Sequence, residues 1–83
     1  MYLHLGGDTV VRMRDVIAIL NAENSSPAPD LKHLLEGAQK RGALKRVTGE
    51  MKAVIVTNGD VYLSPISSTT LKKRADYLAA FGD

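Results

Sequence analysis

The chain has 83 residues, no cysteine and a formal net charge of +2, with 45% hydrophobic and 24% charged residues. This length predicts a single domain over residues 1–83, and the missing cysteines exclude disulfides and thiolate metal sites. No apolar run reaches the length of a signal peptide core or a membrane span, so we expect a cytoplasmic protein without membrane contact.

The N-terminal part predicts strands. "MYLHL" (1–5) alternates around Leu3 and Leu5, and "GGD" (6–8) is a typical hairpin turn. The β-branched and apolar stretches "TVVRM" (9–13) and "DVIAIL" (15–20) predict two more strands, or one bent strand.

A loop and a helix are expected next. Residues 21–30 include Pro27 and Pro29, which disfavour helical angles in the residue before each of them. Asp30 is the candidate N-cap of the helix, and Gly42 is its candidate C′ residue. The apolar spacing i, i+3, i+4, i+7 then predicts an amphipathic helix with Leu31, Leu34, Leu35 and Ala38 on its buried side.

The second half predicts a hairpin and a last helix. "ALKRVT" (43–48) is a short candidate strand, and the continuous apolar run of "KAVIVT" (52–57) indicates a strand buried on both faces. Asn58-Gly59 predicts a turn into the returning strand "DVYLS" (60–64), which Pro65 ends. Ser67 or Ser68 is expected to cap the final helix, whose buried side holds Leu71, Ala75 and Leu78.

The expected order is therefore ββ(β)-α-(β)ββ-α, a small α+β domain with two helices and a mostly antiparallel sheet. A domain of this size without disulfides often gains stability by self-association, so we expect a homo-oligomer.

Catalytic motifs are not found in the sequence. His4 and His33 belong to no metal-ligand motif, and no serine lies in a nucleophile elbow. Both histidines are expected to be hydrogen-bonded or solvent-facing. We expect no enzyme activity, no cofactor, no metal and no small-molecule substrate.

The charge is uneven along the chain. Residues 1–39 hold three basic and five acidic groups, and residues 40–83 hold eight basic and four acidic ones, so their net charges are −2 and +4. The sequence pI of about 9.1 is consistent with nucleic-acid binding.

A basic triplet in the last helix is the first candidate site. If Leu71 faces the core, Lys72 and Lys73 lie about 100° and 200° round the helix and are exposed, while Arg74 lies at the edge of the stripe. Hydroxyl residues at 67–70 stand at the helix N-terminus, where free N–H groups favour phosphate. The alternative is a well-capped helix with a solvated face.

Two arginines in the N-terminal half are the second candidate. Arg12 and Arg14 are two apart, so on a strand they project from one face, as suits bidentate contacts with phosphate or guanine. The alternative is an edge strand that its charges protect from aggregation. Lys52 completes the candidate set, and no aromatic cluster interleaves these charges to stack single-stranded bases.

Three stretches resemble a known family. "YLHLGGDTVV" (2–11), "RDVIAIL" (14–20) and "KAVIVTNGDVYLSPISSTTLKKRA" (52–75) together resemble bacterial extracellular-matrix regulators of the RemA/RemB type. The "HLG-x-D" opening and the "YxSPISSxTLKKRA" close are more similar to the RemB branch, whereas the helix end "AQKRGAL" (38–44) is more similar to the RemA branch.

The resemblance implies a DNA-binding transcriptional regulator of biofilm matrix genes that forms a ring-shaped oligomer along which double-stranded DNA lies. This chain departs from the RemA branch at its important arginines, which align with Asp15 and with about 49–51, including Glu50. Arg14 and Lys52 are the candidates to substitute for them. The alternative is a protein-interaction or assembly module of the same regulatory system that does not bind nucleic acid.

Overall fold

The computed structural model describes residues 1–23 and 29–81. Within these ranges the elements are β1 (Tyr2–Gly6), β2 (Thr9–Arg12), the 3₁₀ helix η1 (Met13–Asp15), β3 (Val16–Asn21), α1 (Pro29–Lys40), β4 (Leu44–Arg46), β5 (Ala53–Thr57), β6 (Val61–Ser64) and α2 (Ser68–Phe81). The predicted α+β order is confirmed. No helix in the described ranges has the length and apolar character needed to cross a membrane.

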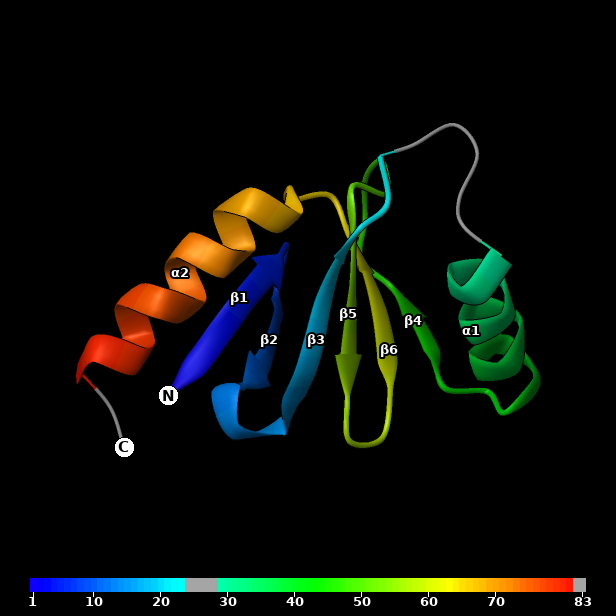
Figure 1. Ribbon diagram of the computed structural model, residues 1–83, viewed down its shortest axis with the longest axis horizontal. Coiled ribbons are helices and arrows are strands. Elements are labelled where there is room, and N and C mark those ends of the chain that lie inside the picture. The colour runs from blue at the N-terminus through cyan, green and yellow to red at the C-terminus, as the bar shows by residue number, and fades with distance from the viewer. Residues whose placement is uncertain (24–28, 82–83) are drawn as a thin grey trace.

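The strands form two sheets. β1 and β2 make an antiparallel hairpin, and the other strands form a four-stranded sheet in the order β3-β5-β6-β4. Only the β4–β6 pair of the described strands is parallel, so the mostly antiparallel character is confirmed. Figure 1 shows α2 running along the hairpin at one end of the molecule and α1 beside β4 at the other end.

The central strand β5 separates two apolar clusters. Successive strand residues point to opposite faces, so Ile55 joins the cluster on the α2 side and Val54 joins the cluster on the α1 side; both are fully buried. The predicted burial of this strand on both faces is thereby confirmed. The α2-side cluster holds Leu3, Leu5, Val11, Val47, Ala53, Ile55 and Leu71.

A buried serine joins the two sheets. Ser64, at the end of β6, is fully buried, and its Oγ donates a hydrogen bond to the Leu5 carbonyl in β1 at 2.6 Å. The same Oγ accepts the N–H of Ile66 at 3.0 Å. The first hydroxyl of the "SPISS" stretch is thus structural, because a buried polar group is stable only when it is hydrogen-bonded.

The helix ends are set by local chemistry. The expectation that Asp30 caps α1 is wrong, because α1 begins at Pro29, whose fixed φ and missing N–H suit the first helical position. Residues 24–28 of the predicted loop lie outside the described residues. At the C-terminus, Gly42 has a φ of +71° and donates to the Gln39 carbonyl, and Ala43 donates to the Ala38 carbonyl. This pair of bonds is a Schellman motif, which confirms Gly42 as the C′ residue.

The 3₁₀ helix η1 divides β2 from β3, so of the two alternatives for residues 9–20 the separate strands are correct. Arg14 lies in η1 and not in a strand, which corrects the expectation that Arg12 and Arg14 alternate along one strand face. Asp15 ties η1 to the β5–β6 turn: its carbonyl accepts the N–H of Asn58 at 3.0 Å, and its carboxylate accepts from Asn58 Nδ2 at 3.3 Å.

Candidate nucleic-acid interface

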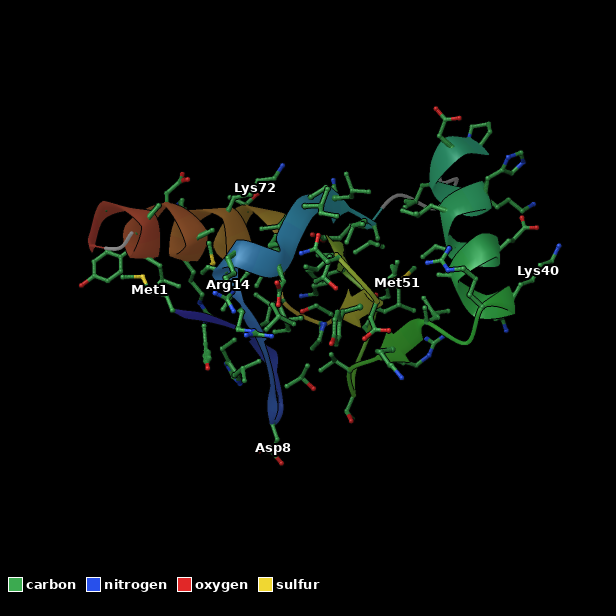
Figure 2. The ribbon with its side chains drawn as sticks, turned by 90° about the horizontal axis from the view of Figure 1, so that it is seen from below. Met1, Asp8, Arg14, Lys40, Met51 and Lys72 are labelled. Carbon is green, nitrogen blue, oxygen red and sulfur yellow. The ribbon has the colours of Figure 1, made fainter. Side chains whose placement is uncertain are left out.

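The orientation of α2 is set by its first turn. Ser67 is the N-cap, because its Oγ accepts the N–H of Thr70 at 3.2 Å. Leu71 is fully buried, and Lys72 and Lys73 are exposed, as the helical spacing predicts. Figure 2 shows Lys72 projecting from α2 away from the side on which Arg14 lies. Lys72 can thus meet a polyanion from the outer side of α2, and Lys73 is exposed next to it.

Arg74 turns toward the hairpin. Its Nη1 donates to the His4 carbonyl at 3.5 Å, while the side chain stays exposed. Lys73 and Arg74 line a shallow depression of about 420 Å³ together with Tyr2, His4 and Tyr77. The structure therefore places Lys73 and Arg74 beside the hairpin, although 70 residues separate Arg74 from His4.

Arg12 and Arg14 share a second depression despite the 3₁₀ helix between them. It has a volume of about 500 Å³ and lies between the start of β1, η1 and the C-terminal half of α2. Arg12 also forms an ion pair with Asp15, with 3.3 Å between Nε and Oδ2. Asp15 thus engages Arg12 of the second candidate site, whereas Arg14, a candidate to substitute for the RemA-branch arginines, lies outside this ion pair.

Lys52 is not part of either group. It is half-buried just before β5, where its N–H donates to the Ser64 carbonyl at 2.8 Å and its carbonyl accepts the N–H of Ala22 at 3.0 Å. It lines neither of the two depressions that hold the other basic candidates. The six predicted residues are therefore divided among three places: α2, the η1 depression and the start of β5.

Position 49 could not carry an arginine in this fold. Gly49 has a φ of +118°, and a Cβ there would lie 2.8 Å from Cβ of Pro65. Glu50, the next residue, is exposed. The close approach of the backbone to Pro65 gives a physical reason for a glycine at this position. The sequence contains no signal for it, because Gly49 and Pro65 meet only in the folded chain.

An acidic depression adjoins Arg12. Asp15, Asn58, Asp60 and Tyr62 line it together with Arg12, Tyr2 and Val10. Burial, with the negative charges of Asp60 and Asp15, raises the pKa of Tyr62 above its ordinary 10.0. This side of the hairpin is less favourable for phosphate than the α2 side, because the carboxylates of Asp15 and Asp60 line it beside Arg12. Sequence reasoning missed this surface.

The histidines have ordinary surroundings. His4 is exposed, with its Nε2 2.8 Å from the Gly7 carbonyl, and His33 is exposed on α1. Across residues 1–23 and 29–81, no group of three or more histidine, aspartate or glutamate side chains is placed to hold a metal ion.

Comparison with known proteins identifies the family. The family model described as RemA-like, extracellular matrix regulatory protein A-like, matches residues 2–75. The chain therefore belongs to the RemA-like family of extracellular matrix regulators. Within that class, it is 40% identical over 78 residues to extracellular matrix regulatory protein B of Bacillus subtilis (strain 168), an alignment that covers 94% of each chain. The resemblance carried by the "HLG-x-D" and "SPISSTTLKKRA" motifs is confirmed.

Proposed function

We propose that this protein is a cytoplasmic transcriptional regulator of biofilm matrix genes that binds double-stranded DNA as a ring-like homo-oligomer. The observation that carries the proposal is the outward display of Lys72 and Lys73 from a helix whose neighbouring residue, Leu71, is fixed in the core. Because that anchor orients the helix, the two charges are exposed in the same way on every copy of the chain. Copies in one assembly then act together on a polyanion.

Arg74, Arg12 and Arg14 extend the basic surface around the same helix, since they line depressions that share Tyr2 and Leu78. All are expected to make mainly phosphate contacts, which position a protein on DNA without reading its sequence. Lys52 is the sixth candidate and contributes to the DNA-facing charge only if its ammonium group reaches past its half-buried position.

Exposed apolar side chains favour self-association. Met1, Tyr2, Val10, Ile17 and Tyr77 are between 51% and 66% exposed, and burying their apolar atoms against a second copy would be favourable. We expect light scattering at micromolar concentration to give a mass of several chains. A mass of one chain under mild conditions would contradict the oligomer.

The salt dependence of DNA binding tests the proposal. A complex held by phosphate contacts releases counterions, so its affinity for a duplex should fall linearly in a log–log plot against salt. If an oligomer makes six or more such contacts, the affinity should drop about 10³-fold or more between 50 and 200 mM salt.

The alternative is an assembly module that binds other proteins and no nucleic acid. The Arg12–Asp15 ion pair and the adjoining acidic depression favour it, because they reduce the positive potential of that face. The same titration separates the two functions. If the oligomer is intact and no duplex binds even at low salt, the assembly module is the better description.

A further inference from the structure

The depression beside η1 has the volume of a small-molecule site, and its lining has a charged part and an apolar part. Its volume is about 500 Å³, within the range of known ligand pockets. Arg12 and Arg14 provide its charged lining, and Tyr2, Met13 and Leu78 provide its aromatic and apolar lining. A ligand that fits both linings carries an anionic group and an apolar or planar body.

Asp15 orients the charged lining. The Arg12–Asp15 pair uses Nε of Arg12 at 3.3 Å, and a guanidinium has five N–H donors, so one carboxylate leaves donors for a second acceptor. Arg14 is exposed, and it forms no ion pair with any residue in the described ranges. Two guanidinium groups therefore border one cavity, one of them held in place and the other uncommitted, which suits the planar recognition of a phosphate group.

The apolar lining favours an organic phosphate over inorganic phosphate as the ligand. Met13 and Leu78 are half-buried. Tyr2 lines the same cavity, although 57% of the residue is exposed. Inorganic phosphate would leave these side chains in contact with water, whereas a ring system attached to the phosphate would cover them.

We propose that this pocket binds a small organic phosphate of nucleotide size. The phosphate lies between Arg12 and Arg14, and the ring system lies against Tyr2, Met13 and Leu78. The compound is a ligand of the regulator and not a substrate. The proposal goes beyond DNA binding, although it uses two arginines, Arg12 and Arg14, that the proposed DNA surface also includes; the cavity and its two linings belong to one chain.

Methionine methyl groups provide the measurement. Met1 and Met13 line the cavity, whereas Met51 packs against the cluster on the α1 side. Figure 2 shows Met1 beside Arg14 under α2 and Met51 on the other side of the sheet. The measurement is the NMR spectrum of protein with ¹³C-labelled methionine methyl groups, titrated with adenosine 5′-monophosphate. We expect saturable shifts of the Met1 and Met13 signals and no shift of the Met51 signal.

Matched variants test the charged lining. Arg14→Gln should weaken the binding of adenosine 5′-monophosphate about tenfold, because it removes one charge-assisted contact to phosphate. Arg41→Gln removes the same group from an exposed position at the end of α1 and should leave the affinity unchanged. An unshifted Met51 signal in the ligand-free Arg14→Gln variant shows that it is folded.

Several outcomes would overturn the proposal. They are the lack of a saturable shift below about 10 mM nucleotide, a Met51 shift as large as that of Met13, or equal affinities of Arg14→Gln and wild type. Adenosine alone and inorganic phosphate alone should each bind more weakly than the nucleotide. If either binds as tightly, the two linings do not act on one ligand. The proposed DNA binding rests on Lys72 and Lys73, so a failure of the nucleotide to bind leaves it standing, and the weaker binding of inorganic phosphate separates a nucleotide site from a general phosphate contact.

Discussion

Replacing Leu71 with alanine should lower the free energy of unfolding by about 2–5 kcal/mol, the usual cost of truncating a buried leucine. Leu71 is fully buried and packs in the cluster that joins α2 to Leu3 and Leu5 of the hairpin and to Ile55 of the central strand. The cavity would open where both sheets and the helix meet, so it cannot close by moving a single element. For a small domain of about 5–15 kcal/mol total stability, this loss is large.

Urea denaturation at one fixed protein concentration measures the change, since self-association would otherwise alter the apparent stability. Lys72→Ala is the matched control, because it places alanine at the adjacent exposed position of the same helix turn. The control should stay within about 0.5 kcal/mol of the wild type. If Leu71→Ala also stays within that range, α2 is not anchored by this side chain, and the fixed direction of its lysines loses its cause.

Changing Lys72 and Lys73 together to alanine should weaken binding to duplex DNA at low salt and reduce the slope of the log–log salt plot. The slope should shrink by roughly one unit for each lost phosphate contact, multiplied by the number of subunits on the same duplex. The protein should remain folded, because both side chains are exposed and alanine is a good helix former. The loss should be alike for different DNA sequences, since phosphate contacts carry no base identity.

The double change of Lys32 and Lys40 to alanine provides the control for total charge. Both are exposed on α1, so this variant has the same net charge as the α2 variant and differs only in where the charge is lost. If both variants weaken DNA binding equally, the effect is one of overall charge and α2 is not the contact surface. If the α2 variant binds with unchanged affinity and slope, its basic triplet is only a solvated helix face.

A variant with both Arg12→Ala and Arg14→Ala tests whether these arginines contact DNA phosphates or base edges. A loss that depends on the DNA sequence would place these arginines at base edges instead of phosphates. Asp15 would lose its partner in this variant, but the ion pair is largely exposed, with side chains 55% and 31% accessible, so little stability is at risk.

Local signals were sufficient for most elements. The alternation of "MYLHL", the continuous apolar run at 52–57, the helical spacing of the leucines in α1 and the serine before α2 each act within a few residues, and the structure has the corresponding strand, buried strand, amphipathic helix and N-cap. The exposure of Lys72 and Lys73 follows from the same local geometry, because one buried leucine sets the rotation of a helix. Family membership was also evident from the sequence, through motifs at both ends of the chain.

The start of α1 shows the limit of such signals. Pro29 and Asp30 are both typical of a helix start, and a pattern of residue types does not decide whether Pro29 is the first helical residue or Asp30 is the N-cap of a helix that begins after it. The structure begins the helix at Pro29. This two-residue difference in the helix start leaves the fold unchanged, because the buried stripe of the helix stays in phase.

Tertiary structure alone decided how the candidate site is divided. The break at η1 takes Arg14 out of the strand, and the return of α2 onto the hairpin then brings Arg12 and Arg14 to one cavity with Leu78. The same return places Arg74 against His4 and lets Ser64 bond to Leu5 across 59 residues. Pro65 leaves no room for a side chain at Gly49, and Lys52, whose backbone pairs with Ser64 and Ala22, lines neither depression of the other basic candidates. Each of these outcomes depends on which segments meet when two sheets and a helix bury a common core, and a contact between distant segments has no counterpart in local residue spacing.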